Sequence, residues 1–158
     1  MCYDHTMNDE ARLSTILSGV AGEYFVAAEL SRRGYIASIT LRNTRGVDIL
    51  ATNAGATRAV TIQVKTNQRS EKSWILSQKV ETAFADNLFF VFVNLNGPTG
   101  VPTYHIVPSA TVATYCRENH AAWLAAPGRG GKPHRDSPVR IFVDHHDHYL
   151  GRWDMLML

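Results

Sequence analysis

Apolar residues in the first part of the chain recur at three- and four-residue intervals, which is the spacing of an amphipathic helix. We expect this helix to run from about Asp9 to Arg33 and to end at Gly34, because glycine readily adopts the left-handed conformation of a helix cap. The stripe expected to face the core consists of Leu13, Ile16, Leu17, Val20, Ala21, Tyr24, Ala27 and Ala28.

Strand-like runs rich in isoleucine, valine and threonine follow the helix. Three are expected at Tyr35–Leu41, Val47–Ala51 and Ala59–Thr66, with Asn53–Thr57 as the hairpin loop between the last two. Leu88–Val93 is an almost continuous apolar run, which is typical of a strand buried on both faces. The remaining expected elements are one or two helical turns within Gln78–Ala85, a strand at Thr103–Val107, a helix from its N-cap Ser109 to Ala125, a flexible loop at Pro127–Pro138, a strand at Val139–Val143 and a helical tail at Tyr149–Leu158. This order predicts an α/β fold with a sheet of mixed direction.

The composition agrees with one globular domain that spans residues 1–158. Hydrophobic residues make up 45% of the chain and charged residues 19%, which excludes a disordered or collagen-like chain. A formal charge of +2 is too small to indicate a nucleic-acid-binding protein by itself. No apolar run is long enough to cross a bilayer and the first residues do not form a secretory signal, so no membrane partner is expected. Cys2 and Cys116 lack metal-binding spacing, and we expect free thiols in a reducing cytoplasm.

The hairpin of the second and third strands gathers polar residues on one face. A symmetric turn places Ile49 opposite Ile62 on the apolar face, and a slip of one residue would expose that face. Asp48 then lies opposite Gln63, with their β-carbons roughly 5 Å apart. Lys65 lies one step further along the same face. A carboxylate, an amide and an ammonium group are therefore expected together.

The first helix can add a fourth polar group. A helical wheel places Glu23 on the shoulder of the apolar stripe, from which it can reach toward Asp48, whereas Glu29 and Arg33 fall on the opposite, solvated side. Carboxylate and amide oxygens suit Mg²⁺ or Mn²⁺. A lysine beside such a metal, here Lys65, can orient or deprotonate a water molecule and offset the charge of a phosphate.

These motifs resemble those of a known group of enzymes. The matching runs are Gly22-Glu23, Gly34-Tyr35, Gly46-Val47-Asp48-Ile49-Leu50-Ala51 and Ile62-Gln63-Val64-Lys65-Thr66. They are similar to the PD-(D/E)XK nuclease superfamily, above all to its small bacterial members and to the archaeal Holliday junction resolvases. The resemblance implies a restriction-endonuclease-like αβββαβ core with a mixed central sheet flanked by helices, metal-dependent hydrolysis of phosphodiester bonds, and a double-stranded or branched DNA substrate. It matches Asp48 to the metal-binding aspartate, Lys65 to the catalytic lysine and Glu23 to the helix-one glutamate of resolvase-like members. Because nucleases of this superfamily often dimerise to cut both strands, a homodimer is one implied state.

The second metal carboxylate of the superfamily is replaced here by Gln63. Glutamine offers a neutral oxygen, but neither charge nor a carboxylate that activates water. Two functions therefore stay open. In the first, Glu23, Asp48 and Gln63 hold Mg²⁺ or Mn²⁺ and Lys65 positions the attacking water of a DNA endonuclease. In the second, a catalytically impaired nuclease fold binds nucleic acid or a partner protein without cutting.

Each site residue also has a purely structural explanation. Asp48 and Lys65 could form a cross-strand ion pair of little energetic worth, and Gln63 could be an ordinary solvent-facing strand residue. We favour a site because four groups converge, although a helix-surface role for Glu23 is an equal alternative. His105 is interpreted as a structural histidine with satisfied hydrogen bonds. The run Asp144-His145-His146-Asp147-His148 is interpreted as a solvated turn rather than a zinc site, and Trp74, Trp123 and Trp153 as core anchors rather than base-stacking residues.

Cations outside the hairpin provide candidate phosphate contacts. Arg69, Lys72 and Lys79 follow the strand that carries Lys65, and Arg129 and Lys132 lie in the glycine-rich loop. All five are predicted to contact DNA, which would make binding depend on salt. For the glycine-rich loop, charges that only improve solubility are an equally good explanation.

Overall fold

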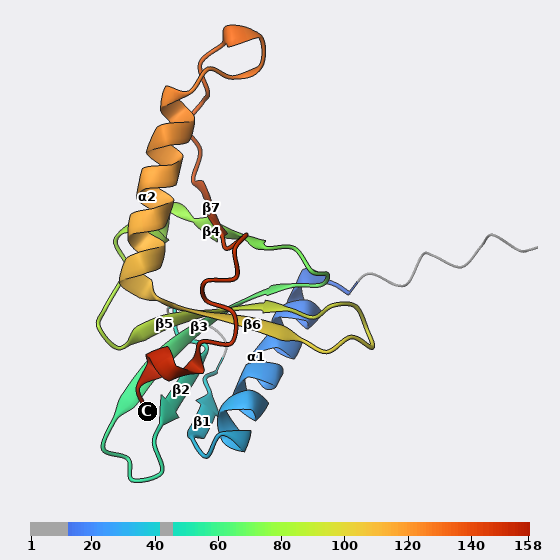
Figure 1. Ribbon diagram of the computed structural model, residues 1–158, viewed down its shortest axis with the longest axis vertical. Helices are drawn as coiled ribbons and strands as arrows, with labels where there is room; N and C mark the ends of the chain where they lie inside the picture. The colour runs from blue at the N-terminus through green and yellow to red at the C-terminus, as the bar shows by residue number, and fades with distance from the viewer. Residues whose placement is uncertain (1–12, 42–45) are drawn as a thin grey trace, which may run out of the picture.

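The computed structural model describes residues 13–41 and 46–158 of the chain (Figure 1). Its central sheet has the strand order β1-β2-β3-β5-β6, in which β3 and β5 are parallel and the other neighbours are antiparallel. A second sheet pairs β4 with β7. The elements are α1 (Thr15–Arg32), β1 (Ile36–Ile39), β2 (Ile49–Thr52), β3 (Ala59–Asn67), β4 (Ser73–Ser77), the 3-10 helix η1 (Gln78–Glu81), β5 (Leu88–Asn94), β6 (Thr103–Pro108), α2 (Ser109–Ala125), η2 (Arg129–Gly131), β7 (Val139–Val143) and η3 (Trp153–Leu156). The expected mixed α/β fold, with a mixed central sheet flanked by helices, is confirmed. The parallel strands β3 and β5 are connected through β4 and η1 rather than through an α-helix.

Helix α1 is capped at both ends by residues that the sequence provides locally. The hydroxyl of Ser14 accepts a hydrogen bond from the Leu17 amide at 3.2 Å. At the other end, Gly34 has a φ of +87°, and the amides of Gly34 and Tyr35 donate to the Ser31 and Leu30 carbonyls, which is the hydrogen-bond pattern of a Schellman cap. The predicted stop at Gly34 is confirmed. The predicted start was wrong for Leu13 and Ser14, which precede the helix, and residues 9–12 lie outside the described residues.

The large side chains of the predicted α1 stripe face away from the sheet, which contradicts the prediction, whereas Ala21 and Ala27 of the same stripe pack against the core. Ile16, Leu17 and Tyr24 are 64%, 58% and 65% exposed. The buried positions are instead Ser18, Gly22, Val26 and Leu30. Glu29 was likewise misplaced, because its side chain is only 15% exposed and pairs with Arg32 and Arg33. Small residues decide which face is buried, since they allow the helix to approach the sheet closely.

The closest approach of α1 to the sheet occurs where Gly22 crosses β3. A Cβ atom at Gly22 would lie 1.9 Å from the Oγ1 atom of Thr66, so no other residue fits without movement. Below this crossing, Val26 and Leu30 pack with Ile62 and other apolar residues of the sheet. The crossing therefore fixes the position of Glu23, the next residue of the helix.

The β2–β3 hairpin has the register that the sequence predicts. Ile49 pairs with Ile62 and Ala51 with Val60, so the alternating apolar side chains of both strands enter the core beneath α1. In the connecting loop, the Asn53 side chain accepts hydrogen bonds from two backbone amides, those of residues 57 and 58, at 2.9 and 3.0 Å. The alternation along both strands determined this register, because a shift by one residue would have exposed the core face.

Strand β5 separates two hydrophobic clusters. Phe89, Val91 and Val93 belong to the cluster beneath α1. Phe90 and Phe92 face the other way and pack with side chains of β4, β7, α2 and η1. Their rings lie 5.7 Å apart and nearly parallel. The predicted burial of this strand on both faces is thus confirmed.

The second half of the chain differs from the prediction in two details. The N-cap of α2 is Pro108, and Ser109 is the first helical residue; its hydroxyl instead accepts from the Ala85 amide at 3.1 Å and donates to the Ala85 carbonyl at 3.0 Å. The expected helical tail is only the short η3 turn at Trp153–Leu156. Figure 1 shows the C-terminal end of α2 and its following loop projecting beyond both sheets.

Within the described ranges, no helix is long and apolar enough to cross a membrane. Of the two cysteines, Cys116 is a buried free thiol. Cys2 lies outside the described residues, so its expected state stays a prediction.

Candidate functional site

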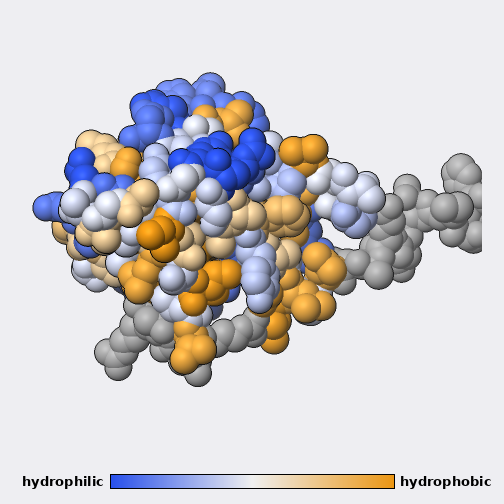
Figure 2. All heavy atoms as spheres, turned by 90° about the horizontal axis from the view of Figure 1, so that it is seen from below, coloured by the Kyte–Doolittle hydropathy of each residue, from blue (hydrophilic) through white to orange (hydrophobic). Residues whose placement is uncertain are grey.

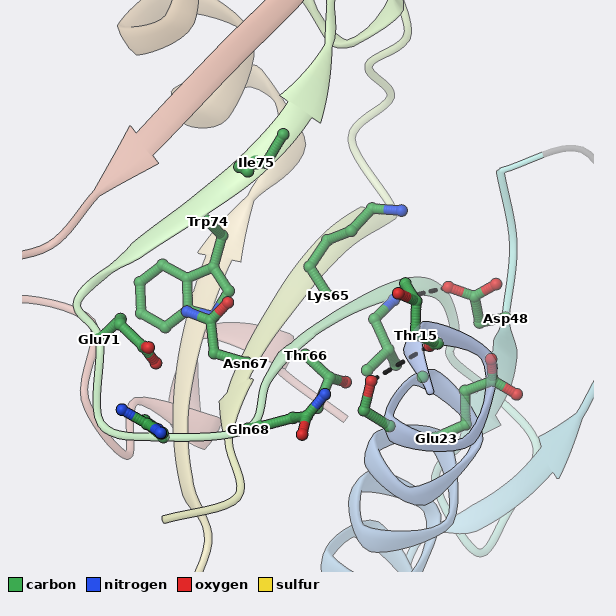
Figure 3. Close-up of a pocket in the computed structure, with 14 residues that line it drawn as sticks. Thr15, Glu23, Asp48, Lys65, Thr66, Asn67, Gln68, Glu71, Trp74 and Ile75 are labelled. Carbon is green, nitrogen blue, oxygen red and sulfur yellow. Dashed lines mark hydrogen bonds between the residues drawn. The ribbon is translucent and has the colours of Figure 1, made fainter. Parts of the chain in front are cut away.

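A pocket of about 900 Å³ lies where α1, the start of β2, the end of β3 and the start of β4 come together (Figure 3). Three of the predicted site residues, Glu23, Asp48 and Lys65, line it. They come from α1, from the residue before β2 and from β3 respectively. Figure 3 shows Glu23 and Asp48 at the same end of the pocket, with Lys65 between them and Trp74.

Backbone hydrogen bonds fix the carboxylate of Asp48. The Asp48 amide donates to the Ile62 carbonyl at 2.8 Å, which continues the β2–β3 ladder by one residue. Its Oδ2 atom accepts a hydrogen bond from the Val64 amide at 2.7 Å (dashed in Figure 3). The carboxylate therefore replaces the next backbone partner of the ladder. A half-buried side chain held in this way is oriented before any ligand arrives.

The positions of Glu23 and Lys65 follow from the elements that carry them. Glu23 directly follows Gly22, so the close crossing of α1 over β3 brings its carboxylate to the pocket. Lys65 projects from β3 on the strand face opposite Val64. Both side chains are half-buried. The pocket thus brings together the three predicted groups, the carboxylates of Glu23 and Asp48 and the ammonium group of Lys65, with a third carboxylate from Glu71.

Gln63 does not line the pocket. The hairpin register places it beside Asp48 on the strand face that carries Lys65, but the stretch of β3 that borders the pocket begins at Val64. The neighbourhood of Asp48 and Gln63 agrees with the expected register. A role for the Gln63 oxygen as a metal ligand stays a prediction.

The donor set of the pocket fits a hydrated divalent cation. Among the described residues, no group of three or more His, Cys, Asp or Glu side chains is placed to hold a metal ion. Mg²⁺, however, usually keeps several waters and takes only one or two protein carboxylates. Glu23 and Asp48 supply that number, and the pocket has room for waters. These residues suit Mg²⁺ or Mn²⁺ with water in the remaining positions.

Further lining residues follow Lys65 along the chain and were not singled out from the sequence. They are Thr66, Asn67, Gln68 and Glu71. Gln68 joins the pocket to the start of α1, because its amide group donates to the Leu13 carbonyl at 2.7 Å and accepts from the Leu13 amide at 2.9 Å. The signal that could have found these residues is their position directly after the predicted catalytic strand.

The predicted phosphate-binding cations occupy four separate places. Arg69 lines the pocket and is exposed. The Lys72 ammonium group lies 2.6 Å from the Asp147 carboxylate, away from the pocket lining. Lys79 is exposed on η1. Arg129 and Lys132 are exposed on the loop beyond α2. Only Arg69 is therefore brought to the pocket.

The histidine-rich turn, which was expected to be solvated, begins at a buried residue, Asp144. Asp144 is buried, and its carboxylate lies 2.7 Å from Nδ1 of the buried His105. It also accepts hydrogen bonds from the amides of His148 and Tyr149. The structural role of His105 is confirmed, whereas the expectation that the whole turn is solvated was wrong.

The three tryptophans differ in exposure. Trp74 and Trp153 are core anchors, with 1% and 6% exposure. Trp123 was wrongly expected in the core, because 41% of it is exposed near the end of α2. A tryptophan at this position needs a different explanation.

No family model matches the chain, and the search of curated proteins gave no match. Among solved structures, the chain is similar to Hjc, a Holliday junction resolvase from the archaeal hyperthermophile Archaeoglobus fulgidus, with 17% identity and a TM-score of 0.45 over 80% of this chain and 84% of that one. It is also similar to the bacterial homing endonuclease I-Ssp6803I, with 16% identity and a TM-score of 0.48 over 66% of this chain and 72% of that one.

Proposed function

We propose that the protein is an endonuclease that hydrolyses DNA phosphodiester bonds with the help of Mg²⁺ or Mn²⁺. The observation that carries the proposal is the meeting of Glu23, Asp48 and Lys65 around one pocket. The PD-(D/E)XK-like sequence motifs contain the same three residues. Two carboxylates and an amine in one pocket suit phosphate hydrolysis, because they can hold a cation and also offset the charge of the phosphate.

Each side chain has a defined task in this proposal. Glu23 and Asp48 would hold the cation, which supplies Lewis-acid stabilisation of the phosphate and lowers the pKa of a bound water. Asp48 is oriented for this task by the Val64 amide. Lys65 would hydrogen-bond the attacking water and keep it in line with the scissile bond. The attacking water loses a proton to the solvent and its oxygen bonds to phosphorus as the bond to the leaving oxygen breaks; the leaving oxygen takes up a proton from the solvent.

A cleavage assay with matched variants tests this function. The substrates are supercoiled plasmid, linear duplex and a four-way junction, each with Mg²⁺, Mn²⁺ or EDTA. We expect metal-dependent cleavage that falls at least 100-fold in Asp48→Asn and Lys65→Met, in the range seen when one electrostatic catalytic group is lost. Asp86→Asn, on an exposed carboxylate of the loop before β5, is the matched control. Cleavage that persists unchanged in Asp48→Asn would contradict the proposal.

A second candidate function is nucleic-acid binding without cleavage. Gln63 favours this function, because the PD-(D/E)XK nucleases that the sequence resembles usually have a second metal-binding carboxylate at this position. The prediction that separates the two functions is the behaviour of Gln63→Glu. If the wild type binds DNA without cutting it and Gln63→Glu cuts in the presence of Mn²⁺, the fold is an impaired nuclease. Robust cleavage by the wild type excludes this candidate.

We also propose that two copies associate through the outer face of α1. Leu13, Ile16, Leu17 and Tyr24 are exposed there, and no charged residue lies among them on that side of the helix. The view from below in Figure 2 shows apolar side chains gathered on one side of the molecule and the most hydrophilic ones on the other. An uncharged helical stripe is self-complementary about a two-fold axis.

Light scattering coupled to size-exclusion chromatography tests this association. The monomer mass is 17.6 kDa, and we expect twice that mass for the wild type. The double variant Leu17→Lys/Tyr24→Lys should elute as a monomer, while Val101→Lys, a matched change at an 83% exposed loop residue, should not alter the mass. A monomeric wild type at micromolar concentration would refute the dimer without affecting the nuclease proposal.

A further inference from the structure

A second pocket, of about 360 Å³, lies between α2 and β7, outside the proposed catalytic site. Its walls combine aromatic rings with apolar side chains, and its floor carries a charged group. The lining residues used below are His120, Trp123, Ile141 and Arg140. The volume is in the range of pockets that take small ligands. None of the functions considered above uses this pocket.

Aromatic rings are stacked at the rim of the pocket. The Trp123 ring lies 4.0 Å from the His134 ring and 5.4 Å from the His120 ring, centroid to centroid, with interplanar angles of 26° in both cases. His120 is held in place by a 2.7 Å contact with the Asp136 carboxylate. With 41% of Trp123 exposed, part of this aromatic stack is accessible to a ligand.

Arg140 provides buried hydrogen-bond donors to the pocket. Its side chain is only 3% exposed and pairs with Glu81. One terminal nitrogen donates to the carbonyls of Ser137 and Val139 at 2.7 and 2.9 Å. The other terminal nitrogen, Nη2, carries two more N–H donors, for which the described residues show no hydrogen-bond acceptor. Nη2 can therefore donate to one acceptor on the edge of a bound ring.

The loop above the pocket is cationic. Arg129, Lys132 and Arg135 are exposed on it, whereas Asp136 is the one acidic residue between residues 126 and 138. An isolated antiparallel β-bridge between Pro127 and Pro133 closes the loop, together with a 2.8 Å hydrogen bond from the Gly128 amide to the Lys132 carbonyl. Its charges therefore lie on a defined turn beside the aromatic stack.

We propose that this pocket binds an unpaired nucleobase, with the neighbouring phosphates held by the cationic loop. Stacking surfaces beside positive charge are the features by which proteins bind single strands, and a base inside a duplex could not enter the pocket without leaving its stack. The inference rests on the proposed function in that it assumes nucleic acid as the partner. It adds a preference for unpaired segments and a contact remote from the cleavage site.

Intrinsic fluorescence gives a specific readout, because Trp74 and Trp153 are buried and Trp123 is exposed. The probe is a 12-nucleotide DNA strand of mixed, non-self-pairing sequence, added alone or with its complement, in EDTA. We expect the single strand to quench tryptophan emission and the duplex to quench it far less. The quenching should disappear in Trp123→Phe.

Anisotropy of the labelled strand measures the same contact independently. Trp123→Ala should weaken binding roughly tenfold, and Arg129→Gln/Lys132→Gln should reduce the slope of log affinity against log salt by about 1.4. Arg58→Gln, in the distant hairpin loop, is the matched charge control. Absence of quenching, equal binding of the duplex, or unchanged affinity of Trp123→Ala would each overturn the inference. Because these assays measure binding and not cleavage, they test the inference even if the protein does not cut DNA.

Discussion

Replacing Gly22 by alanine tests the crossing of α1 over β3 on which the position of Glu23 depends. The new Cβ would lie 1.9 Å from Thr66 Oγ1 and 3.0 Å from Thr66 Cβ. Helix or strand must therefore move by roughly 1.5 Å to regain ordinary contact distances. Overpacking of this kind costs about 1–3 kcal/mol, and the better helix propensity of alanine offsets about 0.5–1 kcal/mol of it. We expect a net loss of ~1–2 kcal/mol, which for a chain of this size lowers Tm by roughly 2–8 °C.

Gly19 supplies the matched control on the same helix. A Cβ at Gly19 would meet no atom within 4 Å. Gly19→Ala should therefore raise the free energy of unfolding by about 0.5–1 kcal/mol. Both variants are compared by thermal and urea unfolding, for which Gly19→Ala is the control. A helix shifted by about 1 Å at Glu23 should also slow metal-dependent cleavage by Gly22→Ala up to 100-fold relative to the wild type, measured well below Tm; Gly19 itself lines the pocket and is not a control for this rate.

A double-mutant cycle shows whether the Thr66 side chain causes the effect. The Thr66 hydroxyl is buried and makes no hydrogen bond within the described structure, so Thr66→Ala loses packing but no polar partner. Gly22→Ala/Thr66→Ala should recover most of the stability lost in Gly22→Ala. Two results would refute the close crossing. One is a Gly22→Ala variant as stable as Gly19→Ala. The other is a double variant whose change in the free energy of unfolding equals the sum of the changes in the two single variants.

Three further predictions concern the second half of the chain. Ser109→Ala should lower the free energy of unfolding by about 1–3 kcal/mol in urea titrations, because it removes both hydrogen bonds of the part-buried Ser109 hydroxyl with the Ala85 backbone, each worth about 0.5–1.5 kcal/mol; an effect below 0.5 kcal/mol would contradict this. Burial alone would raise the pKa of Asp144, but hydrogen bonds from His105 and two backbone amides outweigh it and hold the pKa below its usual range. A pKa lower in the folded than in the unfolded state stabilises the protein above about pH 4 and stops doing so as the pH falls through the folded value, so Tm should drop in acid, and less steeply in Asp144→Asn than in the wild type. Burial raises the pKa of Cys116 to about 11; iodoacetamide at pH 8 should label the peptide of Cys116 only after unfolding, as mass spectrometry can verify, and rapid labelling of the native protein would show that the thiol is accessible.

The sequence predicts the site hairpin well because the apolar alternation of each of its two strands indicates the same register. Apolar alternation on both strands allows one register, and that register alone puts Asp48, Gln63 and Lys65 on a common face. Strand β5 was equally predictable, since a continuous apolar run has no solvent-facing positions. In both cases the physical requirement acts within a few residues of the chain.

The orientation of α1 was not predictable from hydrophobicity. Its largest apolar residues face outward, and its buried face at the crossing is made by Ser18 and Gly22, which contribute little hydrophobicity. The pairing of β4 with β7 depends on strands that lie more than sixty residues apart in the sequence, so no local pattern announces it. The pocket between α2 and β7 joins elements that are close in the sequence, but it depends on how α2 packs against the second sheet, which no local pattern specifies.

The division of β5 between two hydrophobic clusters has a consequence for how the molecule can change. Insertions or substitutions at the end of α2 leave untouched the packing of Phe89, Val91 and Val93 beneath α1, on which Glu23 and Asp48 rely. The loop from residue 127 to residue 138 can thus vary in length and chemistry without disturbing the packing around Glu23 and Asp48. We expect changes in this loop to alter the pocket beside α2 while the pocket beneath α1 keeps its shape.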